Sequence, residues 1–285
     1  MAPYAVPMSS ASLSLTLWAG VWLSGDAAPD EVIDALHAWA PLHLVFAHDD
    51  AAASAAGLPG TGPATGAAAL LTAVRRADPA DTAGLRLVLP APGDVGGLPA
   101  GTAFAAAALA AGEGVLAGAP GTPGIGLVPA VEGPDVLRWT VFAVPALPDA
   151  PAHPGLGEAE FAMREAVRDA AATLTGIPTV GTDGRRTDPR AEIAEAIAEQ
   201  ARHRYPESLP DRAVRILDSA DQVSAILTVA ARGAGLQAGS VSAATGREEA
   251  LRPLLAAVRA ARLGAVAAAL DAGRRSRRSR RTTGG

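Results

Sequence analysis

Residues 85–116, LRLVLPAPGDVGGLPAGTAFAAAALAAGEGVL, place an apolar run before a loop of glycine, proline and aspartate, and an alanine-rich segment after that loop. This order predicts a strand, a loop and a helix, which is the arrangement that builds many phosphate and nucleotide sites. The same alternation extends over residues 12–146 and predicts the order β-α-β-α-β-α-β-β. Such alternation favours an α/β fold with a largely parallel sheet and flanking helices.

The neighbouring segments supply the other expected elements. Residues 13–23 alternate leucine with serine and threonine, which predicts a half-buried strand. A signal peptide carries positive charge before its apolar segment, and no positive residue precedes these residues. Residues 42–47 predict a buried strand, and residues 51–66 predict a low-complexity loop. Two apolar runs joined by a turn predict an antiparallel hairpin at one edge of the sheet. The hairpin strands and the two further expected helices cover residues 125–131, 136–144, 31–40 and 67–77.

The chain changes character after residue 150 and predicts an all-helical region. Helices are expected over residues 158–176, from Asp188-Pro189, over about 210–232, and from Thr245, where Thr245 and Glu248 fit a capping box. Pro253 is expected to kink the last helix or restart it. The inward stripes of these helices include Val167, Ile197 and Ile226. The predicted organisation is an α/β domain (1–150), a helical domain or cap (151–272) and a disordered basic tail (273–285).

Two residue types are missing from the chain, and their absence excludes several chemistries. There is no cysteine, which excludes thiol nucleophiles, disulfides, iron–sulfur clusters and cysteine-based zinc sites. There is no lysine either, so all 24 basic residues are arginine. A lysine Schiff base, a lysine general base and the lysine of a Walker loop are therefore impossible. A chain without cysteine is compatible with a reducing compartment, and we expect a soluble, cytoplasmic protein without membrane contact.

The glycines of the opening stretch do not match a nucleotide fingerprint. Gly93, Gly96 and Gly97 lack the G-x-G-x-x-G spacing, and the relaxed match that begins at Gly112 follows a helix rather than a strand. With 31 glycines in the chain, such a match is expected by chance. The loop is therefore expected to shape a turn.

One group of residues has the composition of a metal site. His48, Asp49 and Asp50 follow one predicted strand, and Asp94 follows another. If these strands are adjacent and parallel, the four side chains meet at the carboxyl edge of the sheet, where α/β proteins bind ligands. The carboxylates would hold Mg²⁺ and His48 would act as acid and base on a phosphorylated or other anionic small molecule. The alternative is structural, because acids after strands also cap helices and occupy turns.

The C-terminal tail concentrates positive charge. It contains six arginines and no acid, whereas the other 18 arginines stand against 29 acids, so the rest of the chain carries −11. The candidate polyanion-binding residues are Arg274, Arg275, Arg277, Arg278, Arg280 and Arg281. The tail could bind nucleic acid weakly, contact an acidic protein, fold back on the acidic N-terminal region, or remain solvated. Ser276 and Ser279 each follow two arginines, which suits a basophilic kinase.

Three functions remain open on this basis. The missing nucleophile, lysine and phosphate-loop signatures favour a non-catalytic interaction or regulatory module whose helical half contacts a protein partner. The alternatives are a metal-dependent enzyme that uses His48, Asp49, Asp50 and Asp94, and a weak nucleic-acid binder that uses the arginine tail. The sequence leaves open whether the protein is an enzyme, which ligand it binds and how it oligomerises.

Overall fold

The computed structural model describes residues 10–77, 84–175, 189–237 and 241–283, which divide into two compact units. The α/β unit comprises the described residues of 10–152, 203–210 and 266–285, and the helical unit comprises those of 153–202 and 211–265. Residues 203–210 and 266–272 thus belong to the α/β unit, whereas a division at residues 150 and 272 assigns them to the helical region.

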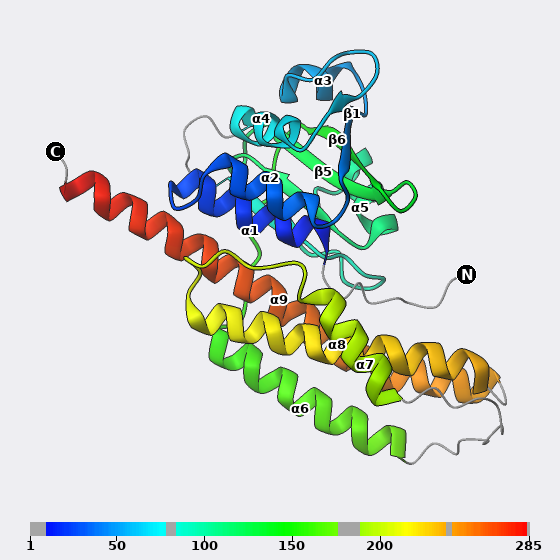
Figure 1. The fold of residues 1–285 in the computed structure, drawn as a ribbon. Helices are drawn as coiled ribbons and strands as arrows, with labels where there is room; N and C mark the ends of the chain where they lie inside the picture. Colours follow the sequence, from blue (N-terminus) through cyan, green and yellow to red (C-terminus); the bar gives the residue numbers. More distant parts are fainter. Residues whose placement is uncertain (1–9, 78–83, 176–188, 238–240, 284–285) are drawn as a thin grey trace. The chain divides into compact units, whose positions relative to one another are not determined.

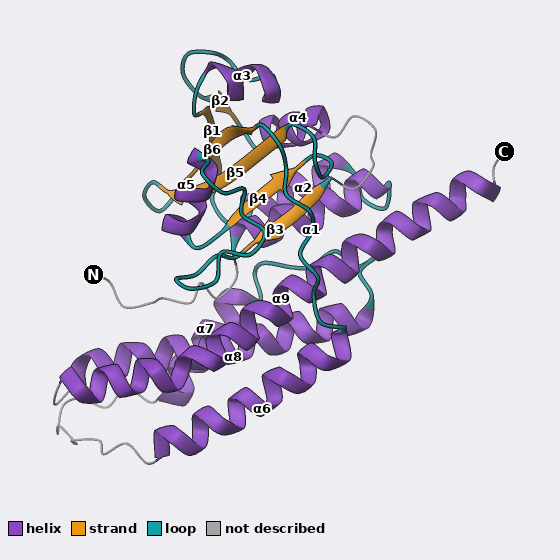
Figure 2. Ribbon diagram, turned by 180° about the vertical axis from the view of Figure 1, so that it is seen from behind, coloured by secondary structure: helices purple, strands orange, loops and turns teal. Residues whose placement is uncertain are grey.

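The α/β unit contains a six-stranded sheet in the order β2-β1-β6-β5-β4-β3 (Figure 2). Among the strands that the structure describes, only the β1–β6 pair is parallel, and the other four pairs are antiparallel. The expectation of a largely parallel sheet is therefore wrong. The hairpin is confirmed as β5–β6, but it lies in the middle of the sheet and not at an edge. The strands are β1 (Leu42–Ala47), β2 (Ala64–Thr65), β3 (Leu85–Val88), β4 (Gly114–Ala117), β5 (Gly124–Val131) and β6 (Val136–Val144).

Helices cover both faces of this sheet (Figure 1). One face packs its buried Trp139 and Leu127 against α1, α2 and α4. The other face packs Phe142 against Phe104 of α5, and the Phe104 ring lies so close to Gly126 that a Cβ there would be 2.2 Å from it. The helices of the unit are α1 (Ala11–Ser24), α2 (Pro29–His37), α3 (Asp50–Ala56), α4 (Ala68–Ala77) and α5 (Ala103–Ala111).

Helix α1 occupies the segment that was expected to be the first strand, so this expectation is wrong. The alternating serine and threonine residues do not face solvent, because the helix is buried on nearly all sides. Thr16 donates its hydroxyl to the carbonyl of Ser12 at 2.7 Å, and Ser24 donates to Gly20 at 2.9 Å. Small hydroxyl side chains can be buried in a helix through such bonds one turn back, which removes the helical periodicity from the sequence.

Three further elements differ from expectation. Residues 51–66 are not all loop, because α3 occupies the first part of this segment and β2 lies near its end. Strand β4 was not expected, since it is only four residues long and begins with glycine. The strands β1 and β3 and the helices α2, α4 and α5 lie where the sequence predicts them.

The helical unit is built from α6 (Leu156–Thr175), α7 (Pro189–Gln200), α8 (Asp211–Gln237) and the first part of α9 (Val241–Thr283). The expected all-helical C-terminal region is confirmed, while the expected cap residue Asp188 lies outside the described residues. Helix α9 begins four residues before Thr245, so the predicted capping box is wrong. The helix also continues through Pro253 without restarting.

Helix α9 extends almost to the end of the chain, so the expectation of a disordered tail is wrong up to Thr283. Within the described ranges, its segment Glu249–Arg280 is long and apolar enough to cross a membrane, by length and composition only. The protein itself buries 44% of the most apolar window of that segment. A core helix of a soluble protein passes the same test.

Candidate functional site

The strands that carry the predicted metal site are not neighbours. Strands β6, β5 and β4 lie between β1 and β3, and the pairings make β3 run opposite to β1. The carboxyl end of β1 and that of β3 are therefore at opposite edges of the sheet. The expectation that these strands are adjacent and parallel is wrong, and the structure does not bring Asp94 to His48, Asp49 and Asp50.

Each of the predicted site residues makes contacts within its own part of the fold. Asp49 caps α3, because its carboxylate accepts the amide N–H of Ala52 at 2.8 Å, and Asp50 is the first residue of that helix. The exposed His48 ring lies 4.7 Å from the ring of Phe142. Asp94 closes a turn in which its amide and carbonyl exchange two 2.8 Å hydrogen bonds with the backbone of Ala91. These contacts match the structural alternative for acids that follow strands.

The described residues contain no group of three or more histidine, aspartate or glutamate side chains that could hold a metal ion. The predicted Mg²⁺ site therefore lacks the converging carboxylates that this ion requires. A catalytic role of His48 stays a prediction, without the partners that the sequence assigned to it.

An acidic residue that the sequence analysis missed lies at the N-terminal end of α1. The carboxylate of Glu113 accepts the amide N–H of Ser12 at 2.9 Å, beside Ser10, whose hydroxyl accepts the N–H of Leu13 at 3.0 Å. Burial raises the pKa of Glu113, while hydrogen bonds from Ser12 and Ser10 oppose this change. The positive end of a helix is a common anion site, and here the chain's own carboxylate occupies it.

The predicted polyanion-binding arginines lie on the last three turns of α9, and several bind the protein itself. Arg277 donates to the carbonyl of Leu23 at 2.5 Å, and Arg280 donates to the carboxylate of Asp26 at 2.6 Å and to the carbonyl of Ser24 at 2.7 Å. We call these three hydrogen bonds the C-terminal arginine contact. Of the remaining arginines, Arg274 pairs with Asp271, Arg275 and Arg278 are exposed, and the side chain of Arg281 lies outside the described residues.

Helices α1 and α9 lie close to each other beside the C-terminal arginine contact (Figure 1), and two glycines allow this approach. Gly20 of α1 faces Leu270 of α9 so closely that a Cβ at position 20 would lie 2.2 Å from the leucine side chain. One turn further along, Gly273 faces Ser24 in the same way, at 2.7 Å. The arginines then reach the last carbonyls of α1, where the helix dipole favours positive charge. The alternative in which the tail folds back on the acidic N-terminal region is therefore confirmed for Arg277 and Arg280.

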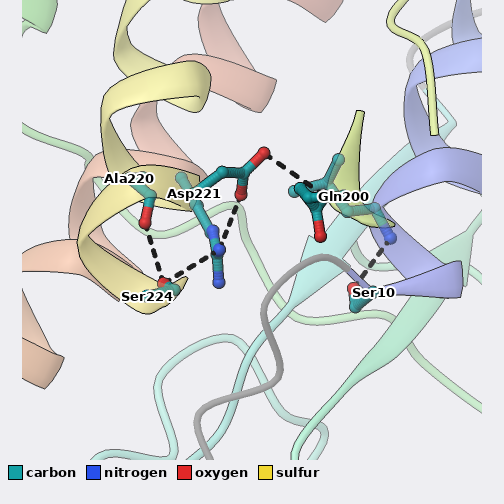
Figure 3. A network of polar contacts seen from close by, with 7 residues as sticks. Ser10, Gln200, Ala220, Asp221 and Ser224 are labelled. Carbon is teal, nitrogen blue, oxygen red and sulfur yellow. Dashed lines mark hydrogen bonds and ion pairs between the residues drawn. The ribbon is translucent and has the colours of Figure 1, made fainter. Parts of the chain in front are cut away.

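The helical unit contains a buried polar network, which Figure 3 shows around Asp221, Ser224 and Gln200. Arg262 of α9 donates to the carboxylate of Asp221 at 2.7 Å and to the hydroxyl of Ser224 at 3.1 Å. Gln200 of α7 donates to the other oxygen of Asp221 at 3.4 Å, and Ser224 donates to the carbonyl of Ala220 at 2.8 Å. Arg262 is 4% exposed and Asp221 is 7% exposed, so the ion pair is buried away from water and salt weakens it little.

This network joins three helices through side chains of fixed geometry. A shift of α9 by one residue along α8 would separate Arg262 from Asp221 and leave a charge buried without its partner. The network therefore specifies how α7, α8 and α9 pair. No sequence signal pointed to it, because one arginine and one aspartate 41 residues apart resemble any other charged residues on helices.

The fold defines an α/β protein with a mixed, mostly antiparallel sheet and a helical C-terminal region. The family model for the N-terminal domain of the Rv1486c-like proteins matches residues 12–155, and the model for their C-terminal domain matches residues 157–263. The chain belongs to this Rv1486c-like family.

Similar proteins come from mycobacteria. The "Uncharacterized protein Rv1486c" of Mycobacterium tuberculosis is 41% identical over 283 residues, which cover 91% of this chain and 96% of that protein. The "Uncharacterized protein ML1804" of Mycobacterium leprae is 38% identical over 289 residues, with 91% and 97% covered. The "Uncharacterized protein MAV321" of Mycobacterium avium is 35% identical over 298 residues, with the same shares covered. No solved structure matches the chain.

Proposed function

We propose that this protein is a non-catalytic interaction module and that its helical unit provides the surface for a protein partner. The observation that carries the proposal is the exposure of large apolar side chains on three helices of that unit. Phe161 of α6 is 60% exposed, Ile226 of α8 is 49% exposed and Ile197 of α7 is 37% exposed. Burying such a side chain completely is worth about 1.5–3 kcal/mol, so a partner that covers them gains free energy.

The sequence pattern placed some of these residues in the core. Val167, Ile197 and Ile226 were expected on inward stripes, yet each is at least 37% exposed. Residues on the same helices do fill the core, as Met163 and Leu217 show at 3% and 0% exposure. The exposed side chains are therefore additional to the core and are available for contact with a partner.

Two of the helices that present these side chains, α7 and α8, also share the buried Arg262–Asp221 network with α9. A network that fixes the pairing of α7, α8 and α9 holds Ile197 and Ile226 in a constant arrangement. A preformed surface loses less entropy on binding than a flexible one. The proposal places the protein in the cytoplasm, since a chain without cysteine gains nothing from an oxidising compartment.

Site-specific photocross-linking in a mycobacterial host tests this function. A benzophenone amino acid replaces Phe161 or Ile226 in the full chain, and the control replaces Arg202, which follows α7 and has a side chain that is 65% exposed. We expect a discrete cross-linked product from positions 161 and 226 and none from position 202. Equal cross-linking at all three positions, or none at any, would contradict an interaction surface on these helices.

A further inference from the structure

Arg280 is shared among three acceptors at the C-terminal arginine contact. Its guanidinium donates to Asp26 at 2.6 Å, to the carbonyl of Ser24 at 2.7 Å and to the hydroxyl oxygen of Ser276 at 3.1 Å. Ser276 lies one helical turn before Arg280 on α9, which is the spacing at which side chains on a helix meet. Ser276 is an exposed residue, and its hydroxyl is bonded to the arginine that holds the end of α1.

Ser276 also has the surroundings that a basophilic kinase recognises. Arg274 and Arg275 precede it directly, and Arg275 and Ser276 are both exposed. It lies in the last turns of α9, where helices fray and a kinase can bind an extended chain. The chain has no lysine, so guanidinium groups alone supply the positive charge around this serine.

We propose that Ser276 is a phosphorylation site and that phosphate on this residue opens the C-terminal arginine contact. A basophilic serine kinase supplies the reaction with ATP as phosphoryl donor. The hydroxyl oxygen of Ser276 forms a bond to the γ-phosphorus, the bond from that phosphorus to the bridging oxygen breaks, and ADP leaves with the electron pair. The hydroxyl proton passes to the base of the kinase.

The phosphate competes for Arg280 with the groups that hold it now. It adds about −1.5 to −2 charge and three acceptor oxygens one turn from Arg280. It also lies near the carboxylate of Asp26 and the terminal carbonyls of α1, which repel a second anion. Arg280 therefore turns toward the phosphate, and the carbonyl of Ser24 and the carboxylate of Asp26 lose their donor.

Ser279 provides a matched control because it has the same kind of sequence but a different position. One turn after Ser279 stands Thr283, and one turn before it stands Arg275, so Arg280 is merely its neighbour in sequence. Adjacent residues on a helix do not face each other. A phosphate at position 279 adds the same charge to the tail without competing for Arg280.

A first experiment tests the modification. The full chain is incubated with ATP and a basophilic serine kinase, and phosphorylated residues are identified by mass spectrometry in the native chain, Ser276→Ala and Ser279→Ala. We expect phosphate on Ser276 in the native chain and in Ser279→Ala. A chain that takes no phosphate, or takes it only on Ser279, would overturn the assignment.

A second experiment tests the effect on α1 and does not depend on a kinase. Phosphoserine is encoded genetically at position 276 or 279, and amide hydrogen exchange is measured at Gly25 and Asp26, whose N–H groups bond to Trp22 and Val21 at 2.9 and 3.0 Å. Phosphoserine at position 276 removes the charged contacts of Arg280, which are exposed, and we expect this loss to accelerate the exchange about threefold. Phosphoserine at position 279 should leave the exchange rate unchanged. Arg280→Ala should give the same acceleration, and phosphoserine 276 should add nothing to it. Equal exchange rates in the two phosphorylated forms would refute the release of α1. An exchange rate in the form with phosphoserine 276 that does not exceed the native rate would also refute it.

Discussion

At the scale of single residues, His43 shows how a buried titratable group is held neutral. The indole N–H of Trp139 donates to Nδ1 of His43 at 3.1 Å, so this nitrogen carries no proton. The other ring nitrogen, Nε2, lies 3.0 Å from the carbonyl of Leu36 and donates to it. Burial lowers the pKa of His43, and this effect exceeds the opposing hydrogen bond to Leu36.

We predict that His43 makes the α/β unit less stable in acid. Because the pKa is lowered in the folded state, the unfolded chain binds more protons once the pH falls below about 6.5, and the free energy of unfolding decreases until the folded pKa is reached. The decrease is at most about 1.4 kcal/mol per pH unit for one group. Urea unfolding followed by tryptophan fluorescence at pH 7.5, 6.5 and 5.5 measures this slope. His43→Gln should flatten it, and an unchanged slope in this variant would contradict the prediction.

Residue patterns predicted individual roles better than their combination. Sequence position after β1 was sufficient to expect Asp49 either as a ligand or as a helix cap, and the 2.8 Å bond to Ala52 shows the cap. Whether Asp94 lies nearby depends on strand order, which no local pattern contains. Glu113 could not be identified, since only the folded chain brings it to Ser12, 101 residues earlier.

At the scale of elements, the buried ion pair between α8 and α9 gives the largest expected effect. Asp221→Ala leaves the charge of Arg262 buried without its carboxylate, which typically costs about 3–5 kcal/mol. Thermal and urea unfolding followed by circular dichroism at 222 nm measures the loss. The double variant Asp221→Leu with Arg262→Met removes both charges and should recover most of the stability. A cost below about 1 kcal/mol for Asp221→Ala would indicate that water reaches the pair.

Element prediction succeeded where one periodic signal dominated. Helices α2 and α4 and the strands of the hairpin have clear start and stop signals and lie where they were expected. Helix α1 was mistaken for a strand because its buried serines and threonines imitate alternation. The arginine-rich end of α9 has the local sequence of a solvated tail. No local signal indicates that carbonyls of α1 accept hydrogen bonds from its arginines.

At the scale of the whole molecule, the alternating pattern predicted the α/β class and failed to predict the sheet. Helix α5 joins β3 to β4, and a parallel sheet would require these two strands to run in the same direction. They are neighbours, but they run antiparallel. The one parallel pair joins β1 to β6, and more than 80 residues separate them. Pairing over that distance depends on which apolar faces fit together, so it is not contained in local periodicity.

Charge distribution leads to a prediction about nucleic acid. The body of the chain is acidic, and Arg277 and Arg280 already bind the end of α1, so few arginines remain for phosphate contacts. Affinity that rests on few such contacts is weak and falls with salt. We expect no mobility shift of duplex DNA or single-stranded RNA at about 0.15 M salt. A salt-dependent shift that disappears when residues 274–285 are deleted would restore the nucleic-acid alternative.

The contact between α1 and the end of α9 also constrains when the protein can finish folding. Asp26 and Arg280 are 254 residues apart, and the chain grows from its N-terminus. At about 5–20 residues per second, the ribosome needs roughly 13–50 s to deliver the arginines after α1 has emerged. Until then the terminal carbonyls of α1 and the face around Gly20 have no covering helix. Completion of the α/β unit therefore waits until the last turns of α9 have been synthesised, and a nascent chain that stops before residue 270 exposes this surface to chaperones and proteases.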